Sequence, residues 1–274
     1  MKSYLMKYRT WLIVICVLSI SILLVNCSKE DGGSSGINIF SLDQDVTLGA
    51  QVAHEIDSDK TNYPVLSQAQ YPAAYKFINH VRDTILSTGK VQHAKDFPWD
   101  VYIINKDVLN AFCTPGGHIY FYSGLIKYLD NEAQFAGVMG HEMAHAACRH
   151  STEQLTKTYG ITTLLNVVLG KDQGLISQIA TSLLVLQFSR SNENEADEYS
   201  VKYLYPTDYD ATGAAGFFQR MAAADTSKYK LTFLSTHPSD EHRIANITSQ
   251  WQTLGGKSGQ TFDTRYQQFK STLP

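Results

Sequence analysis

"GHEMAH", at Gly140–His145, places two histidines four positions apart with a glutamate directly after the first. On an α-helix, residues i and i+4 lie on the same face one turn apart, so His141 and His145 can direct two imidazoles at one metal ion. Glu142 is rotated one position from that line and can reach a water molecule bound to the same ion. Zinc lowers the pKa of such a water toward ~7, and a carboxylate beside it can then take the proton. The spacing therefore predicts a helix that carries part of a hydrolytic zinc site.

The alternative interpretation is an ordinary surface helix that happens to carry these residues. A shuffled chain of this composition would contain H-E-x-x-H only about 0.01 times, so chance explains the motif poorly. The neighbouring positions Val138, Met139, Ala144 and Ala147 are apolar. That composition favours a buried helix over a solvated one.

Two imidazoles do not complete a catalytic zinc site, which takes three protein ligands and leaves one position for water. The candidates for the third ligand are His150, Glu153, Glu193, Glu195, Asp197 and His237. His150 comes nine residues after His141 and, on the same helix, has the wrong phase. Glu193 and Asp197 are again spaced i, i+4, so a second helix could supply one ligand and one carboxylate that orients a ligand histidine. Acidic residues are also favourable at any helix start, and spacing leaves both Glu193 and Glu195 open.

The rest of the chain predicts an α+β domain that is predominantly helical. Residues 99–105 and 118–125 are rich in β-branched and aromatic residues and predict two strands, with a turn at the Pro-Gly-Gly of 115–117. The simplest connection between them is a small antiparallel sheet. Apolar periodicity predicts a helix at 73–86, and further helices are expected at 44–57, 192–204, 212–224 and 240–252, and in the C-terminal tail.

Two apolar runs, 159–169 and 175–188, follow the motif helix and are split by a polar segment. Each is shorter than the ~17 residues that a membrane span needs. The favoured interpretation is a helical hairpin packed on the domain, and the alternative is a hairpin that dips into a membrane.

The N-terminus has the pattern of an exported lipoprotein. A positively charged start precedes the 15-residue apolar run Trp11–Val25, which is short for a membrane span and suits a signal-peptide core. "LLVNC" (Leu23–Cys27) resembles a bacterial lipobox, with Asn26 in place of the smaller residue usual before the lipid-modified cysteine. We therefore predict a signal peptide at 1–26 and a lipid on Cys27.

Charge and cysteine content limit the remaining possibilities. Residues 1–26 carry three positive charges and no acid, so their removal takes the net charge from -3 to -6. Without a basic block, nucleic acid is not expected as a partner. A flexible tether is expected at 27–41 and one domain at 42–274. Its two cysteines, Cys113 and Cys148, could form a disulfide or remain two free thiols.

Four blocks occur in one characteristic order: "NAFCTPGGHIYFYSGLI" (110–126), "VMGHEMAHAACRHS" (138–151), "SRSNENEADEYS" (189–200) and "STHPSDEHRI" (235–244). Together they resemble peptidase family M48, the zinc metallopeptidases of the CAAX prenyl endopeptidase and the bacterial membrane protease HtpX. The resemblance implies a zincin-like metalloprotease domain with a gluzincin-type site. It places the third ligand of a single Zn²⁺ at Glu193, beside His141 and His145, and the supporting carboxylate at Asp197. Glu195 is then a spare residue that faces solvent.

The same resemblance assigns further roles around the zinc. His237, in the "HP" element, would stabilise the oxyanion or gate the site. Asn110, Ala111 and Phe112 match the edge strand that binds an extended substrate by β-augmentation, although we favour a core position for the Phe112 side chain. Arg243 is expected to form a structural ion pair.

This chain lacks the long membrane spans of the prenyl endopeptidase and of HtpX, so prenyl-protein processing is not carried over. It resembles the short lipoprotein members of the family. We therefore expect a zinc endopeptidase of the bacterial envelope that acts on unfolded or misassembled polypeptides. A lipid would anchor the protein to a membrane. The expected location is the outer membrane, at its periplasmic face or at the cell surface. The alternative is a zinc-stabilised, chaperone-like binding lipoprotein with little catalysis, against which the intact Glu142 argues.

Overall fold

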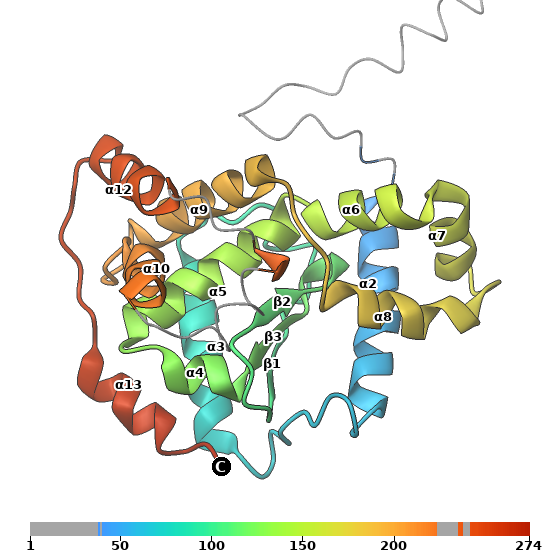
Figure 1. Cartoon of the computed structure of the whole chain (residues 1–274), viewed down its shortest axis with the longest axis horizontal. Helices are drawn as coiled ribbons and strands as arrows, with labels where there is room; N and C mark the ends of the chain where they lie inside the picture. The colour runs from blue at the N-terminus through green and yellow to red at the C-terminus, as the bar shows by residue number, and fades with distance from the viewer. Residues whose placement is uncertain (1–37, 39, 224–234, 238–241) are drawn as a thin grey trace, which may run out of the picture. The chain divides into compact units, whose positions relative to one another are not determined.

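The computed structural model describes residue 38 and residues 40–223, 235–237 and 242–274. The predicted signal peptide, Cys27 and most of the tether lie outside the described residues. The described part is an α+β domain that is predominantly helical, as predicted (Figure 1). Its elements are α2 (Leu42–Ser58), α3 (Pro72–Ser87), β1 (Val101–Ile104), β2 (Ala111–Cys113), η1 (Pro115–Gly117), β3 (Ile119–Tyr122), α4 (Ser123–Tyr128), α5 (Glu132–Ala147), α6 (His150–Tyr159), α7 (Ile161–Val168), η2 (Gln173–Leu175), α8 (Ile176–Leu183), α9 (Arg190–Leu204), α10 (Gly213–Ala223), α12 (Arg243–Thr253) and α13 (Asp263–Lys270).

The sheet is mixed, with the strand order β1-β3-β2. β1 and β3, the two strands that the sequence predicts, run parallel, with Val101 opposite Ile119. The prediction of a purely antiparallel sheet is therefore wrong. Between these strands the chain first forms the three-residue edge strand β2, antiparallel to β3. It then reverses at η1, where Gly116 and Gly117 adopt positive φ angles of 72° and 87°, a conformation that glycine adopts without a Cβ clash.

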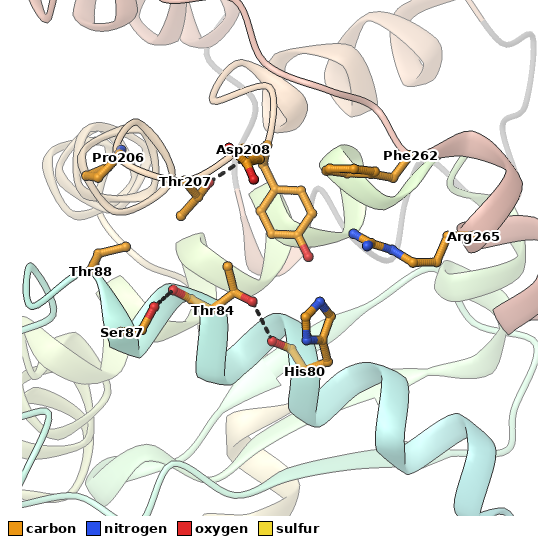
Figure 2. Close-up of a pocket in the computed structure, with 10 residues that line it drawn as sticks. His80, Thr84, Ser87, Thr88, Pro206, Thr207, Asp208, Phe262 and Arg265 are labelled. Carbon is orange, nitrogen blue, oxygen red and sulfur yellow. Dashed lines mark hydrogen bonds between the residues drawn. The ribbon is translucent and has the colours of Figure 1, made fainter.

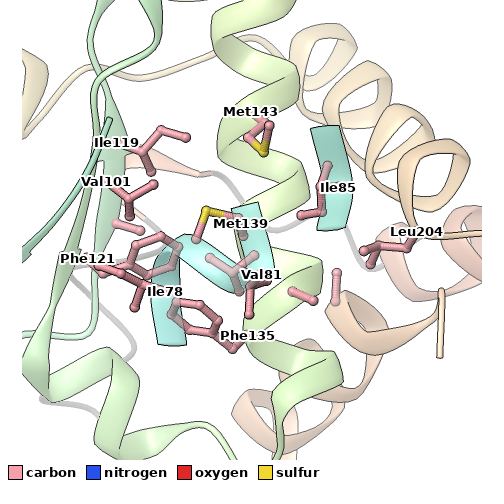
Figure 3. Close-up of a cluster of buried hydrophobic side chains, with 14 of the residues drawn as sticks. Ile78, Val81, Ile85, Val101, Ile119, Phe121, Phe135, Met139, Met143 and Leu204 are labelled. Atoms are coloured by element: carbon pink, nitrogen blue, oxygen red, sulfur yellow. The ribbon is translucent and has the colours of Figure 1, made fainter. Parts of the chain in front are cut away.

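Helices cover both faces of this sheet, because successive side chains of a strand point to opposite sides. Ile119 and Phe121 of β3 join a core cluster with α3 and α5, which Figure 3 shows. Tyr120 and Tyr122 join a second cluster with α2, α7 and α8. The strand residues of β3 are buried on both sides, which explains why its sequence is apolar throughout instead of alternating.

The helix that carries the H-E-x-x-H motif, α5, lies at the centre of the domain, and all sixteen of its residues are buried. Asn131 caps its start with a side-chain hydrogen bond. Two glycines allow neighbouring helices to approach its backbone. A Cβ at Gly137 would lie 2.4 Å from the backbone nitrogen of Ala214 on α10, and one at Gly140 would lie 2.9 Å from Ser200 Oγ on α9. Close packing against α9 and α10 thus fixes the position of the motif.

The helix does not continue to His150, although the sequence contains no proline or glycine to stop it. α5 ends at Ala147, Arg149 adopts the left-handed conformation with φ 62°, and α6 begins at His150. The Arg149 Nε atom lies 2.5 Å from Asp45 Oδ2 on α2, and its guanidinium also donates to the Phe40 carbonyl. This tertiary anchor holds the break and turns His150 away from the phase that a continuous helix would give it.

The two apolar runs after α6 form a helical hairpin of α7 and α8, as favoured from the sequence. Both helices pack against α2, and their inward-facing side chains are buried in the second core cluster. None of the helices in the described part of the chain combines the length and the apolar character that crossing a membrane requires.

Candidate metal centre

His141 and His145 point their imidazoles to the same place, as the i, i+4 spacing predicts. The two Nε2 atoms lie 3.0 Å apart, and the residues are 3% and 0% exposed. Phe188 stacks on the His145 ring at a centroid distance of 4.0 Å and an interplanar angle of 22°. No sequence pattern marked this aromatic contact, because Phe188 lies in the segment between α8 and α9.

α9 brings Glu193 to the two histidines and leaves Glu195 on a different side. A capping box at Ser189 starts this helix and places Glu193 in its first turn. Its Oε1 atom lies 3.5 Å from His145 Nε2, and its Oε2 atom lies 3.5 Å from His141 Nε2. Of the two glutamates that spacing left open, Glu193 is the one in the cluster.

His237 completes the group from a segment far along the chain. Its Nδ1 atom lies 3.1 Å from Glu193 Oε1 and 3.4 Å from His141 Nε2. The residue before His237, Thr236, is held in place by a backbone hydrogen bond, in which the Phe188 N–H donates to the Thr236 carbonyl. The four side chains are buried and their donor atoms all lie within 4.8 Å of one another.

The spacing of these donors fits a tetrahedral zinc site. Zn–N and Zn–O bonds of 2.0–2.2 Å put the ligand atoms of a tetrahedron about 3.4 Å apart. The five donor–donor distances given above, which involve both carboxylate oxygens of Glu193, run from 3.0 to 3.5 Å. Imidazole nitrogens with one carboxylate are also the donor types that zinc prefers. The residues present therefore fit a zinc ion.

Glu142, one residue beyond the first histidine, is fully buried beside this cluster. Neither of its carboxylate oxygens has a hydrogen bond to the described part of the chain, and its Oε1 atom is 3.5 Å from His237 Nε2. Burial raises its pKa, although His237 and His141 act in the opposite direction. Burying a carboxylate without a hydrogen-bond partner costs folding free energy. The position of Glu142 is therefore best explained by a functional role or by a bound partner such as a water molecule.

Asp197 and Arg243 support His141 from behind. Asp197 Oδ1 lies 2.9 Å from His141 Nδ1, so the carboxylate can accept the Nδ1 proton when Nε2 faces the cluster. Arg243 is 1% exposed, and its Nη2 and Nε atoms donate to the two carboxylate oxygens of Asp197 at 2.6 and 2.7 Å. Its Nη1 atom lies 2.9 Å from Glu193 Oε2. The ion pair predicted for Arg243 is present, but it forms part of the cluster itself.

These charges shift the pKa values of the two helix histidines in opposite directions. Burial lowers the pKa of His141, but the Asp197 and Glu193 carboxylates outweigh burial and raise it to about 9. Burial holds the pKa of His145 well below its usual value, with only Glu193 acting strongly the other way. The pKa of Glu193 lies well below its usual value, because His237 and the two helix histidines outweigh the effect of burial.

Glu195 does not face solvent, and that prediction is wrong. It is 9% exposed, and its Oε2 atom lies 3.2 Å from His150 Nε2. His150 Nδ1 in turn lies 3.0 Å from His145 Nδ1. The break after Ala147 makes this contact possible, because it puts His150 on a separate helix that turns back toward His145.

The predicted substrate segment lies at an edge of the sheet, next to the metal cluster. In the described part of the chain, β2 pairs only with β3. Asn110 Oδ1 accepts a hydrogen bond from Thr236 Oγ1, and Ala111 is fully buried. Phe112 stacks on Tyr120 at 4.9 Å, which confirms the core position that we favoured for its side chain.

The two cysteines of the domain are free thiols, so they form no disulfide with each other. Cys113 is buried with its Sγ atom 3.6 Å from Ser151 Oγ. Burial, with a further contribution from Glu142, raises its pKa well above the usual value. The raised pKa favours the neutral thiol form of Cys113.

A separate pocket of about 570 Å³ lies between α3, the segment after α9 and the start of α13 (Figure 2). None of the cluster residues lines it. Each hydroxyl of Thr84, Ser87, Thr88 and Thr207 in its lining donates to a nearby backbone carbonyl. These hydroxyls are thus committed to local structure, and the metal cluster remains the candidate functional site.

A helical α+β fold that buries an H-E-x-x-H pair against a glutamate from a second helix defines a zincin-like metallopeptidase. The sequence agrees: residues 73–250, more than half of the chain, match the model of Peptidase family M48. The chain belongs to this family.

Individual relatives extend the similarity beyond the matched domain. The chain is 29% identical over 219 residues to "Mitochondrial metalloendopeptidase OMA1" of Schizosaccharomyces pombe, covering 78% of this chain and 63% of that protein. It is 26% identical over 265 residues to "Beta-barrel assembly-enhancing protease" of Escherichia coli, covering 85% of this chain and 49% of that protein. It is 28% identical over 269 residues to "Metalloprotease LoiP" of Escherichia coli, covering 92% of this chain and all of that protein. The chain thus spans less than two thirds of the first two relatives and the full length of the third.

Proposed function

We propose that this chain is a zinc-dependent endopeptidase of the bacterial envelope, with His141, His145 and Glu193 as zinc ligands. The observation that carries the proposal is the set of donor distances of 3.0–3.5 Å around one buried point. Glu142 beside that point has two buried oxygens without hydrogen-bond partners in the described chain. A zinc ion held there would lower the pKa of a water molecule and polarise the carbonyl of a peptide bond.

Glu142 is the proposed general base and acid. Its carboxylate takes the proton of the attacking water and then passes it to the amine that leaves. Burial raises the pKa of Glu142 above its usual value, the direction that makes its carboxylate a stronger base toward the attacking water. Within the described residues no hydrogen bond competes for either oxygen, and His237 Nε2 lies 3.5 Å from Oε1.

His237 has two possible positions in this scheme. In the present arrangement its Nδ1 atom lies 3.1 Å from Glu193 Oε1 and 3.4 Å from His141 Nε2, so His237 could serve as a further ligand if zinc were bound there. Catalysis needs the fourth ligand position for water. We therefore propose that His237 closes the resting site and, when displaced, donates to the oxyanion that forms on the attacked carbonyl. Asp197 is assigned to hold His141 with Nε2 toward the metal.

The edge strand β2 is the proposed docking site for an extended polypeptide. Asn110, Ala111 and Phe112 lie along an edge that no other described strand occupies, and all three are buried, so a substrate would have to displace the side chains that cover this edge. A substrate segment that adds to this edge would gain main-chain hydrogen bonds independent of its sequence. This mode suits unfolded or misassembled polypeptides, which expose extended backbone.

The envelope location rests on the N-terminal sequence and on the relatives. A lipid on Cys27 would tether the domain, and we propose the outer membrane as the site of anchoring. Incorporation of labelled palmitate should occur in the whole chain and disappear in Cys27→Ser. Equal labelling of both would contradict the anchor without touching the proposed chemistry.

Glu142→Gln tests the chemistry, because it preserves the volume and removes the base. We expect one zinc per chain in this variant, measured by elemental analysis, and a loss of casein cleavage of about 10²–10⁴-fold. Glu153→Gln is the matched control, since Glu153 pairs with Lys157 on α6 and lies outside the cluster. Glu193→Ala should lose zinc. Full activity in Glu142→Gln would refute the mechanism.

The same measurements separate this proposal from a chaperone-like binding protein. A binding protein would hold zinc and unfolded polypeptides but would cleave neither casein nor outer-membrane polypeptides with or without chelator. The Glu142 carboxylate, which has no hydrogen bond within the described residues, favours the peptidase, because a purely structural zinc site has no need of a buried base.

A further inference from the structure

His145 is linked to a buried carboxylate through a second histidine. His150 is 1% exposed and starts α6, and Glu195 projects from α9. The contacts run from His145 Nδ1 to His150 Nδ1 at 3.0 Å, and from His150 Nε2 to Glu195 Oε2 at 3.2 Å. Three helices, α5, α6 and α9, therefore supply one line of side chains that ends at the proposed zinc ligand.

The positions of the protons along this line follow from its chemistry. If His145 binds the metal through Nε2, its single proton is on Nδ1 and points at His150. His150 Nδ1 must then accept, so the proton of His150 is on Nε2. That proton points at Glu195 Oε2, which accepts it as a carboxylate. Each of the two hydrogen bonds thus has one donor and one acceptor, and one tautomer of each ring is selected.

A second metal site is the competing interpretation of this region. Cys148, His150 and Glu195 offer three ligand atoms within 4.8 Å of one another. A metal bound to His150 Nε2 would move the His150 proton to Nδ1, directly against the Nδ1 proton of His145 at 3.0 Å. The two sites therefore exclude each other if both rings bind through Nε2. Burial and Glu195 also raise the pKa of the Cys148 thiol, which opposes its use as a thiolate ligand.

We propose that His150 and Glu195 are positioning residues that fix the tautomer and ring orientation of the metal ligand His145. This inference rests on the proposed function, in which His145 holds zinc. The two helix histidines are then supported differently. His141 contacts the Asp197 carboxylate directly at 2.9 Å, whereas a neutral imidazole separates His145 from its carboxylate. Partners of this kind raise ligand basicity, and their loss costs about 10–100-fold in metal affinity.

The test compares zinc affinity, measured by competition with a chromophoric chelator, in four variants. His150→Leu removes the acceptor and should weaken zinc about 10–100-fold. His150→Asn places an acceptor near the former Nδ1 and should retain more affinity, which guards against a general loss of fold. Glu195→Gln keeps an acceptor without the charge and should weaken zinc less than His150→Leu. Cys148→Ser, in the same cluster, is the control and should match the wild type.

Cobalt substitution adds a readout that general destabilisation does not change. The visible spectrum of bound Co²⁺ should shift in His150→Leu and stay unchanged in Cys148→Ser, because His150 orients a ligand ring and Cys148 does not. Suppose that the wild type binds one zinc and cleaves casein, and that His150→Leu binds zinc with an affinity within twofold of the wild-type value. This result would overturn the inference about His150 and leave the proposed function standing. Two zinc ions per wild-type chain, one of them lost in Cys148→Ser, would overturn the inference in favour of the second site. A wild-type chain that binds no zinc would refute the proposed function itself.

Discussion

Replacing Gly137 by alanine should destabilise the domain by about 2 kcal/mol, because two helix backbones meet at this residue. An ideal Cβ there would lie 2.4 Å from the Ala214 backbone nitrogen and 3.0 Å from its Cα. The contact is reciprocal, since a Cβ at Gly213 would lie 2.0 Å from the Ala133 carbonyl oxygen. Backbone atoms cannot move to another rotamer, so α5 and α10 must separate by roughly 1 Å to reach ordinary packing distances.

The magnitude follows from two opposing effects. Inserting a methyl group into a packed core costs about 1–3 kcal/mol, and contact with fixed backbone places Gly137→Ala at the upper end. Alanine favours a helix over glycine by about 1 kcal/mol, which offsets part of that cost. Because Gly137 precedes His141 by one helical turn, displacement of α5 should also weaken zinc binding.

Urea denaturation followed by circular dichroism, with chelator present so that bound metal does not contribute, measures the free energy of unfolding. Gly216→Ala is the matched control on α10. A Cβ there first meets the Gln134 Nε2 atom, at 3.3 Å, and that flexible side chain can move. The control should therefore be neutral or up to about 1 kcal/mol more stable. Wild-type stability in Gly137→Ala, or equal loss in both variants, would refute the close-packing argument.

Three further predictions concern charge and metal. Arg243→Met removes the guanidinium that pairs with the buried carboxylates of Asp197 and Glu193, so the metal-free protein should lose about 3–5 kcal/mol of unfolding free energy, and the zinc-loaded protein less, in the same urea assay. Burial raises the pKa of Asp45 despite Arg149, so the native state binds this proton more tightly than the unfolded chain, whose pKa is 3.8. Unfolding free energy should accordingly fall as pH rises above about 4, and urea titrations of Asp45→Asn between pH 4 and 7 should lack this component. Zinc at 100 times its dissociation constant should stabilise the wild type by about 2.7 kcal/mol, seen as a raised melting temperature that chelator abolishes; an equal rise in Glu193→Ala would contradict the ligand assignment.

The features that depend on local helix geometry could be predicted from the sequence. His141 and His145 lie on one face of a helix wherever it packs, so their convergence required no tertiary information. Glu193 was different, because spacing allowed Glu195 equally, and only the family resemblance separated the two. Long-range packing decides which face of α9 meets α5, and that face is set by contacts such as Ser200 against Gly140.

The predictions that proved wrong share a physical cause, which is a tertiary contact that overrides local pattern. Helical periodicity gives no reason for a break at Arg149, since the left-handed conformation there is held by Asp45, 104 positions earlier. The break in turn places His150 against His145 and draws Glu195 into the interior. Likewise, residue pattern does not mark the three-residue strand β2, and the family resemblance that indicates an edge strand there does not give its pairing with β3, so the parallel pairing of β1 and β3 was not inferred.

The complete burial of α5 has a consequence for how this protein tolerates mutation. A helix with one solvent-facing stripe offers positions where substitutions drift freely, and those positions give a baseline for judging the others. α5 has no such stripe, because all sixteen of its residues are buried. A saturation scan scored by activity alone would mark the whole helix as essential, with His141 and Glu142 no more sensitive than Gly137 or Met139. Measuring protein abundance in the same library would separate the two kinds of position. Substitutions at catalytic and ligand positions abolish activity while the folded protein stays abundant, whereas substitutions at packing positions lower the abundance of the protein.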